Sequence, residues 1–592
     1  MKHSVFLQCL LVLVAVCSTS VASEDAHPNV VIVITDDQGH GDLSCHGNPV
    51  LKTPNLDELA ADSIRLTDFH VSPTCSPSRA AFMTGRCSNR TGVWHTIMGR
   101  SLLRENEITI AELLRDTGYA TGMFGKWHLG DNAPFRAEDR GFTEVYRHGG
   151  GGVGQTPDYW DNAYFDGHYL HNGEYEPAEG FCTDVFFKHA TNFIKEQAGQ
   201  KRPFFAWIST NAPHGPLHCP EKWSAPYKDQ GNVADFLGMI ANIDSNVGEL
   251  RKVIHELGIA DNTIFIFTTD NGTAGGANIF NSKMRGRKGS PYDGGHRVPC
   301  FIHWPGKYTG GVDIDPLTAH VDLLPTLVEL CGAKLSDNVK LDGQSIVPLL
   351  NKPTSVDEKW NQRVIVTDSQ RVLDPIKWRQ SAVMTSQWRL VNGKELYDID
   401  ADPSQKTDLA ADHPEVVSRL TQAYDSWWAD IEPGFARFAR IHIGSPNEKT
   451  TCLTAHDWLG LQKNPPWNQA HIRKGQPRKP GYWSVKVLAA GDYSFTLRRW
   501  PVETDLAIDA GLAKGDPVPG KKAYRQNVGV TIEPVKAELK IGNDVQTVEF
   551  AAGSKEVSFD ATLTTGENTI TACFESADGE RIGAYYVYVT RK

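Results

Sequence analysis

Cys75 stands in a segment whose residue types suit the binding and chemistry of an oxyanion. The sequence there is Cys75-Ser76-Pro77-Ser78-Arg79. Pro77 suits the first turn of a helix, because its fixed φ fits and its missing N–H would have no partner there, and Ser76 is a good N-cap. Cys75 is then at a helix N-terminus, where free amides and the helix dipole favour an anion, and Arg79 adds a full charge one turn on. We expect a tetrahedral oxyanion to be held at this point.

Acidic side chains follow a strongly apolar run near the N-terminus. Residues 29–35 are a continuous β-branched run, typical of a strand buried on both faces of a parallel sheet. Asp36 and Asp37 come next, and adjacent carboxylates repel each other unless a cation lies between them. The alternative is a solvated turn. Residues 263–269 repeat the apolar pattern and end in Asp270.

Basic side chains follow two further predicted strands. Lys126 and His128 come after a short strand expected over residues 119–124, and at this spacing they point to the same side of an extended segment. His214 follows a buried strand expected over residues 203–210. Taken singly, surface positions or a core histidine are the alternatives. Their recurrence beyond the ends of strands separated by helices predicts an open α/β sheet with its site at that edge.

Two of these stretches resemble the motifs of a known family. Residues 75–79 are similar to the Cys-x-Pro-x-Arg maturation motif of the formylglycine-dependent sulfatases, and residues 118–130 resemble the second signature of that family. The resemblance covers about residues 29–430. It implies an alkaline phosphatase-like α/β fold, with a large, mixed, mostly parallel sheet flanked by helices and then a smaller antiparallel-sheet subdomain.

The resemblance also implies the nucleophile and the metal site. A formylglycine-generating enzyme converts the cysteine to 3-oxoalanine, and the hydrated aldehyde is the nucleophile. The implied metal ligands are Asp36, Asp37, the converted Cys75, Asp270 and Asn271. Oxygen ligands alone suit Ca²⁺ and, less well, Mg²⁺, and no His-rich or Cys-rich set supports zinc.

The remaining implied catalytic residues bind charge or move protons. Arg79, Lys126 and Lys288 stabilise the charge of the transferring sulfate. His214 protonates the departing alcohol, and His128 takes a proton from the second hydroxyl of the hydrate, which expels sulfate. Residues 149–154 are rich in glycine without the spacing of a phosphate-binding loop, so we expect a loop over the site, with residues 158–160 shaping the substrate pocket.

Length and composition describe a globular protein of several domains. The chain has 592 residues, 40% of them hydrophobic and 22% charged, and the length indicates two to four domains. The net charge of -11 argues against general nucleic-acid binding. Eight cysteines remain besides Cys75, Cys9 and Cys17, and their spacing shows no metal or redox pattern.

The N-terminus has the three regions of a secretory signal peptide. A basic start precedes the apolar run of residues 5–16, and a small-residue stretch ends at Ala22, where we expect cleavage. A membrane anchor is the alternative, but the run is shorter than the roughly 18 residues of a spanning helix. We therefore predict an exported protein without a membrane span, periplasmic or extracellular, or in a lysosome-type compartment if eukaryotic.

The pattern of the chain changes after about residue 435. Alternating runs at residues 483–487, 492–497 and 536–541, with turns between them, indicate an antiparallel β-sandwich. For most of its tryptophans (Trp458, Trp467, Trp483 and Trp500) core positions are favoured, with stacking on sugar rings as the alternative. We predict a signal peptide at 1–22, a catalytic domain at 23–355, a subdomain at 356–435 and an accessory C-terminal module at 436–592.

The most concrete prediction is an enzyme that hydrolyses sulfate monoesters, with a sulfated carbohydrate as its partner. One alternative is a phosphate or phosphonate ester hydrolase of the same superfamily, which shares the metal site. Another is a secreted sugar-binding protein without activity, in which Cys75 is never converted. Helices expected over residues 106–118, 244–258 and 414–428 complete the predicted architecture.

Overall fold

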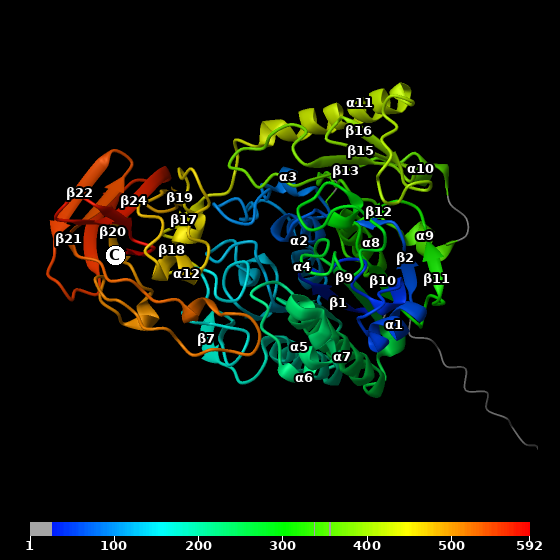
Figure 1. The fold of residues 1–592 in the computed structure, drawn as a ribbon, viewed down its shortest axis with the longest axis horizontal. Helices are drawn as coiled ribbons and strands as arrows, with labels where there is room; N and C mark the ends of the chain where they lie inside the picture. Colours follow the sequence, from blue (N-terminus) through cyan, green and yellow to red (C-terminus); the bar gives the residue numbers. More distant parts are fainter. Residues whose placement is uncertain (1–26, 337, 354–356) are drawn as a thin grey trace, which may run out of the picture.

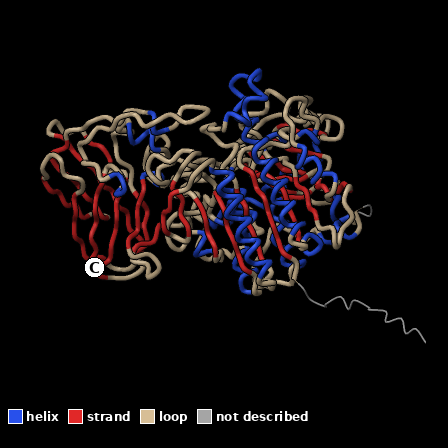
Figure 2. Tube along the Cα trace, turned by 90° about the horizontal axis from the view of Figure 1, so that it is seen from below, coloured by secondary structure: helices blue, strands red, loops and turns tan. Residues whose placement is uncertain are grey.

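The computed structural model describes residues 27–336, 338–353 and 357–592, so the predicted signal peptide lies outside the described residues. It contains a large sheet between layers of helices, a small antiparallel sheet, and two further sheets formed by the C-terminal module (Figure 1). Figure 2 shows that strands dominate the module, whereas helices and strands alternate in the larger part. Among the described helices, none is both long and apolar enough to cross a membrane.

Parallel strands form the centre of the large sheet. Its order is β11-β2-β10-β9-β1-β8-β4-β5-β6-β7, and the run from β9 to β5 is parallel throughout. Antiparallel pairing occurs toward both edges, as at β10–β9 and β5–β6. The strands are β1 (Asn29–Thr35), β2 (Ile64–Leu66), β4 (Ala120–Gly125), β5 (Glu144–Arg147), β6 (His168–His171), β7 (Glu174–Pro177), β8 (Phe204–Ser209), β9 (Thr263–Thr269), β10 (Cys300–His303) and β11 (Val312–Ile314).

Strand β1 is buried at every position because both of its faces are covered. Val30, Ile32 and Ile34 enter one hydrophobic core, whereas Val31 and Val33 enter a second core on the opposite face. Helices α2 (Cys75–Thr84), α4 (Ile110–Asp116) and α8 (Leu323–Leu330) pack in the first core. Helices α1 (Pro54–Ala61), α5 (Cys182–Gly199) and α7 (Ala234–Glu256) pack in the second. The shorter helices are α3 (Ser88–Thr91), α6 (Glu221–Ser224), α9 (Val347–Asn351), α10 (Glu358–Asn361) and α12 (Gln469–Arg473).

Two helices begin at positions that differ from the prediction. Helix α4 begins after Thr109, whose side chain forms a capping box with Glu112, several residues later than expected. Helix α7 begins ten residues before Asp244, the predicted first residue. Asp244 is buried inside α7 and accepts hydrogen bonds from Asn55 and the backbone of Leu56, at 2.8 Å each. It therefore joins α7 to α1 from inside the helix.

The predicted small sheet follows the large one in the chain. Its strands β13 (Ile365–Asp368), β14 (Ser381–Met384), β15 (Trp388–Val391) and β16 (Glu395–Asp398) are antiparallel neighbours in chain order. Helix α11 (Pro414–Ile431) covers one face, since Leu420, Tyr424 and Trp428 pack against Val383 and Leu390. A two-stranded parallel ladder pairs β3 (Phe69–His70), which follows β2 in the chain, with β12 (Thr318–Ala319), which lies between β11 and β13.

The C-terminal module is built from two mainly antiparallel sheets. One contains β17 (Ile441–Ile443), β19 (Trp483–Val487), β21 (Pro534–Ile541), β22 (Asp544–Glu549), β24 (Gly566–Ser576) and β25 (Arg581–Gly583). The other contains β18 (Thr450–Thr454), β20 (Gly491–Arg498), β23 (Val557–Leu563) and β26 (Tyr586–Arg591). Their shared core buries Trp458, Trp483 and Trp500 and also takes in Phe135 and Trp160 from the larger part.

Candidate active site

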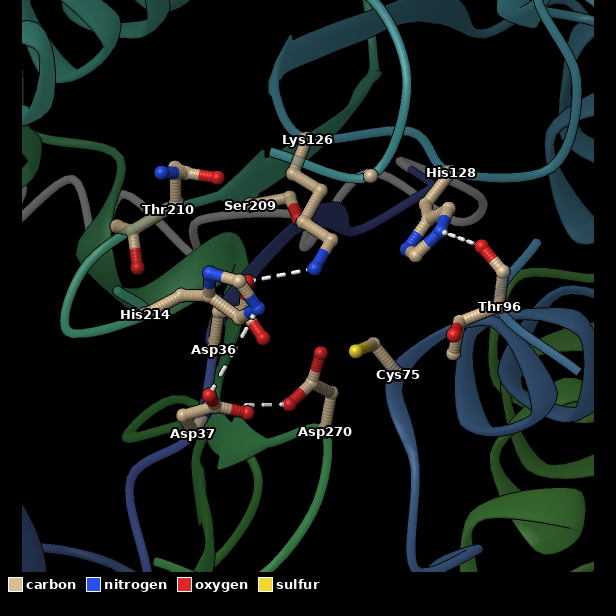
Figure 3. A network of polar contacts seen from close by, with 12 residues as sticks. Asp36, Asp37, Cys75, Thr96, Lys126, His128, Ser209, Thr210, His214 and Asp270 are labelled. Carbon is tan, nitrogen blue, oxygen red and sulfur yellow. Dashed lines mark hydrogen bonds and ion pairs between the residues drawn. The ribbon is translucent and has the colours of Figure 1, made fainter. Parts of the chain in front are cut away.

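The predicted site residues meet because four parallel strands end together. Thr35 pairs with Thr269 across β1 and β9, while Ser209 of β8 pairs with Ile34 of β1 and with Gly125 of β4. Carboxyl ends of adjacent parallel strands lie at one edge of the sheet. The residues that follow these ends are Asp36, Asp37, Lys126, His128, His214, Asp270 and Asn271, and Figure 3 shows most of them around Cys75.

Cys75 is the first residue of α2, as the sequence indicated, although the N-cap is Thr74 and not Ser76. Pro77 is still compatible, because the third helical N–H has no intrahelical acceptor. The thiol is 2% exposed, and its Sγ lies 3.5 Å from the Lys288 ammonium. Burial raises the pKa of Cys75, against the opposing charges of Lys126 and Lys288. The unmodified side chain is therefore a neutral thiol and a poor nucleophile near neutral pH.

Three buried cation–carboxylate pairs surround the thiol. Lys126 Nζ lies 2.6 Å from Asp36 Oδ2, and both side chains are fully buried. Arg79 donates through Nε and Nη2 to Asp270 Oδ2, at 3.1 and 2.7 Å. The third pair joins Lys288 to Asp37 Oδ1. Burial opposes the charge on Lys288, but Asp37 outweighs it, so the pKa of Lys288 is raised above its usual value.

Oxygen atoms that lack partners lie within the same cluster. Ligand atoms of Asp36, Asp37 and Cys75 all lie within 4.8 Å of one another. Asp36 Oδ1 and Asn271 Oδ1 are buried and have no hydrogen-bond partner among the described residues. Asn271 instead donates through Nδ2 to Asp37 Oδ1 at 3.0 Å. Buried acceptors without donors are costly, and a cation with oxygen ligands would satisfy them, so this donor set fits a hard divalent ion.

The tautomer of His128 follows from its single hydrogen bond. Its Nε2 lies 2.9 Å from the carbonyl oxygen of Thr96, which can only accept, so Nε2 carries the hydrogen. Nδ1 then presents a lone pair, and it is buried without a partner in the described part of the chain. Burial, with Lys126 adding to the effect, lowers the pKa of His128 well below its usual value. The neutral ring can therefore accept a proton at Nδ1.

His214 lies on the opposite side of the carboxylates (Figure 3). Its Nδ1 lies 2.6 Å from the carbonyl oxygen of Gly215, and its Nε2 lies 3.9 Å from Asp37 Oδ2. Burial lowers the pKa of His214 to about 3, although Asp37 acts in the other direction. Before substrate binds, the ring is therefore neutral, with its Nε2 edge toward the site.

A cavity of about 260 Å³ opens beside Cys75. Four of the predicted residues line it, namely Cys75, His128, His214 and Lys288. It is also lined by residues that the sequence analysis did not place in the site, which are His95, Thr96, Ile97, Gln155, Arg371, Asn464 and Trp467. Ser209, which accepts from Arg79, was missed as well, although its position at the end of a predicted strand was a usable signal.

The glycine-rich loop lies against His128, beside the cavity. A Cβ on Gly151 would lie 2.2 Å from the His128 ring, so only glycine fits there without displacement. Asp158 closes the loop by accepting from the amides of Gly149 and Gly154, at 3.1 and 2.7 Å. The prediction that residues 158–160 shape the pocket is wrong in detail, because Gln155 lines the cavity while Trp160 packs against the C-terminal module.

Comparison with known proteins assigns this arrangement to a family. The family model described as Sulfatase matches residues 28–333, just over half of the chain. The chain belongs to the sulfatase family. A second model, described as N-sulphoglucosamine sulphohydrolase, C-terminal, matches residues 287–426 of this sulfatase, which contain the small antiparallel sheet.

Curated relatives agree on the type of reaction. Human (Homo sapiens) arylsulfatase A is 35% identical over 351 residues, which are 55% of this sulfatase and 68% of the relative. Dog (Canis lupus familiaris) N-acetylgalactosamine-6-sulfatase is 30% identical over 375 residues, covering 58% and 69%. This sulfatase is a sulfuric ester hydrolase of the alkaline phosphatase superfamily.

A solved structure confirms the predicted fold class. The crystal structure of Ps i-CgsB in complex with k-i-k-neocarrahexaose aligns with a TM-score of 0.63 at 29% identity. The alignment covers 69% of this sulfatase and 94% of that chain. A metal and a formylglycine are features of the family, and the oxygen-rich cluster fits the metal.

Proposed function

We propose that this sulfatase hydrolyses sulfate monoesters of carbohydrates and that Cys75 is converted to the formylglycine that does so. The observation that carries the proposal is the position of Cys75, at a helix N-terminus with Asp36 and Asp37 within 4.8 Å. A neutral buried thiol is a poor nucleophile at this position, whereas a hydrated aldehyde has two hydroxyl groups, one to attack and one to be deprotonated. When bound, the divalent ion polarises the sulfate, and the hydrate supplies the nucleophilic oxygen.

Asp36, Asp37, Asp270 and Asn271, with the converted residue 75, would hold the ion. We propose Ca²⁺, because every ligand is an oxygen and the set mixes carboxylates with an amide. Mg²⁺ fits less well, since it keeps several waters and this cluster is buried. Against the effect of burial, Lys288 and His214 hold the pKa of Asp37 below its usual value, so this carboxylate is ionised, which is the form that a metal needs.

Arg79, Lys126 and Lys288 would stabilise the charge on the transferring sulfate. Each is already fixed by a carboxylate, so each can hold its position without reorganising when the transition state forms. Lys288 is the cation that lies beside Cys75 Sγ. Lys288 would therefore stabilise mainly the charge on the sulfate oxygen atoms that lie nearest the nucleophile.

Two histidines would move the protons. The free Nδ1 of His128 can take a proton from the hydroxyl of residue 75 that does not attack, because Thr96 fixes the ring as an acceptor. His214 would deliver a proton to the departing alcohol from Nε2, the edge that faces Asp37. The negative charge of a bound sulfate ester favours the protonated form of this ring, against the effect of burial.

The proposal also covers the substrate class, the localisation and the domain division of the protein. One relative is named for N-acetylgalactosamine-6-sulfate and one matched structure holds a neocarrahexaose, which supports a sulfated carbohydrate for this chain. The N-terminal pattern of residues 1–22 supports export. We also propose the division into a catalytic domain (23–355), a subdomain (356–435) and an accessory C-terminal module (436–592).

Cys75→Ala tests this proposal, and we expect it to abolish sulfatase turnover while the fold remains. The methyl group fits where the thiol was and leaves all three charge pairs intact. Turnover of an aryl sulfate would be measured beside circular dichroism and thermal unfolding, and mass spectrometry of the Cys75 peptide would detect the aldehyde in the parent protein. Wild-type rates in the variant would contradict the proposal. Faster hydrolysis of aryl phosphonate or phosphate than of aryl sulfate would favour the alternative hydrolase.

A further inference from the structure

The C-terminal module contributes directly to the wall of the active-site cavity. Asn464 and Trp467 of the module line the same cavity as Cys75 and His214. Trp467 is also unlike the other three tryptophans of the module, which are at most 1% exposed in its core. Its side chain is half-buried, at the cavity. The module therefore presents an aromatic surface to whatever enters the site.

The segment that carries Trp467 is held firmly against the glycine-rich loop. The carbonyl oxygen of Trp467 accepts from the Thr156 amide at 3.1 Å. Gln469, which is fully buried, accepts from the Asp161 amide at 2.8 Å and donates to the carbonyl oxygens of Gln155, Asp158 and Tyr159. Because these hydrogen bonds fix the backbone, the indole of Trp467 has a defined position in the lining of the cavity.

Arg371, which belongs to neither the strand ends nor the C-terminal module, lines the same cavity. Arg371 lies in the loop between β13 and β14, and its backbone is held by Trp94. Its guanidinium makes no hydrogen bond or ion pair with any residue that the structure describes, and it is exposed. It lies beside Gly289, since a Cβ there would be 3.5 Å from Arg371 Nη1. Lys288, which directly precedes Gly289, is one of the residues proposed to bind the sulfate.

The charge of Arg371 is available for a ligand. No Asp or Glu is among the described residues that line the cavity, whereas Lys288 is already paired with Asp37. An unpaired guanidinium binds carboxylate or sulfate through two parallel N–H groups. The indole offers a flat apolar surface with a polar N–H, which suits the face of a pyranose ring. The two side chains therefore match an acidic sugar better than a neutral one.

We propose that Trp467 and Arg371 form a subsite for an acidic saccharide, in which Trp467 supports a sugar ring and Arg371 binds a second anionic group of the substrate. This inference rests on the proposed function, because the first anionic group is the sulfate ester at residue 75. It makes Trp467 and Arg371 specificity-determining residues, and it gives the C-terminal module a part in substrate selection.

The test compares Trp467→Ala, Trp467→Phe and Arg371→Ala in the full-length enzyme. Each is assayed on 4-nitrophenyl sulfate, on a sulfated hexosamine with no other charge, and on two disaccharides in which the second anionic group is a uronic carboxylate or a second sulfate. We expect Arg371→Ala to lower kcat/KM on one or both acidic disaccharides by about 10- to 100-fold more than on the sulfated hexosamine, mainly through KM. The disaccharide that shows the loss identifies the anion.

Trp467→Ala should lower kcat/KM on the disaccharides at least about tenfold more than on the aryl ester, and Trp467→Phe should recover most of that loss because it keeps a ring. Arg419→Ala is the matched control, since Arg419 is exposed on α11 of the same subdomain and does not line the cavity. An equal loss on every substrate, or none on the disaccharides, would overturn the inference.

Binding separates this inference from the proposed function. Isothermal titration of the Cys75→Ala protein with each disaccharide needs no turnover, so a protein without sulfatase activity still reports on the subsite. We expect Arg371→Ala to weaken binding of an acidic disaccharide about 10- to 100-fold. An unchanged Kd in both the Trp467 and Arg371 variants rejects the subsite, whereas absent turnover in the parent enzyme rejects only the proposed reaction.

Discussion

Every positively charged side chain at the centre of the site is matched by a carboxylate. Lys126 with Asp36 and Arg79 with Asp270 are almost entirely buried, where a single unpaired charge would cost several kcal/mol. The pairing offsets these charges, whereas Asp36 Oδ1 and Asn271 Oδ1 have no hydrogen-bond partner among the described residues. These two oxygens make metal binding favourable, and they lead to the first prediction.

Ca²⁺ should stabilise the protein through Asn271. At a free concentration one hundred times its Kd, a ligand that binds only the folded state adds about 2.7 kcal/mol to the free energy of unfolding. We expect chelation to lower the unfolding temperature, Ca²⁺ to restore it, and Mg²⁺ to restore less. Asn271→Leu removes an unpaired oxygen without breaking a charge pair, so it should lose most of the Ca²⁺-dependent shift in a thermal melt. A full shift in that variant would contradict the ligand assignment.

His320, which is not one of the proposed metal ligands, should make the fold sensitive to acid. Burial lowers the pKa of His320 to about 3, and its Nε2 accepts from the Ser72 amide at 3.2 Å. The unfolded chain takes up a proton near pH 6.5, but the folded chain does not. Stability is therefore complete above about pH 6.5 and falls toward pH 3, by up to about 1.4 kcal/mol per pH unit for this group.

His320→Gln keeps an acceptor for the Ser72 amide but cannot take up the proton. The free energy of unfolding would be measured in urea at several pH values between 7.5 and 5. As the pH is lowered, we expect it to fall less steeply in the variant than in the parent protein, by up to about 1.4 kcal/mol per pH unit. An identical slope in the two proteins would mean that other groups govern the acid response.

At the scale of single elements, the strands were the most predictable part of the chain. Strands β1 and β9 begin and end where the apolar runs indicated, because burial on both faces favours the continuous apolar stretches at residues 30–34 and 264–267. The site residues at their ends followed from that pattern and from the resemblance. The start of α7 was not predictable, because an aspartate is seldom buried inside a helix and the partners of Asp244 on α1 lie far away in sequence.

The glycine-rich loop gives a prediction at the same scale. Gly151→Ala places a methyl group against the His128 ring, so either the loop or the ring must move. Displacing a catalytic group by about 1 Å can cost about 10²-fold in rate, so we expect a loss of that order in kcat/KM with little change in thermal stability. Gly199→Ala at the end of α5 is the control, since an added methyl there meets nothing. Equal activity in both variants would show that the contact is unimportant.

At the scale of the whole molecule, the active site is assembled from three parts of the chain. The strand ends supply the charged residues, the β13–β14 loop supplies Arg371, and the C-terminal module supplies Trp467. Arg371 could not be predicted, because no local pattern marks a loop residue that reaches a cavity only through tertiary packing. Trp467 was one of four tryptophans for which stacking on a sugar ring was the alternative, and the sequence did not distinguish it from the other three. Leu102, Phe135 and Trp160 of the larger part also belong to the core of the module.

Removing the C-terminal module should therefore destabilise the rest of the protein. A chain that ends at residue 435 exposes Leu102, Phe135 and Trp160, which are at most 7% exposed in the whole molecule. Each buried side chain of this size contributes about 1.5–3 kcal/mol, and the exposed patch favours aggregation. We expect a lower unfolding temperature and oligomers in size-exclusion chromatography. Phe135→Ser and Trp160→Ser in the truncated chain should make the exposed patch more polar and partly restore the monomer. A stable truncated monomer would show that the two parts are independent.

The enclosure of Cys75 bears on when its proposed conversion would take place. A side chain that is 2% exposed beneath its neighbours offers no approach to a second enzyme once the polypeptide has closed around it. On the proposed function, the catalyst that oxidises this residue would have to reach it on the nascent or still unfolded chain. Folding and maturation would then compete, and a molecule that folds first would remain without its nucleophile.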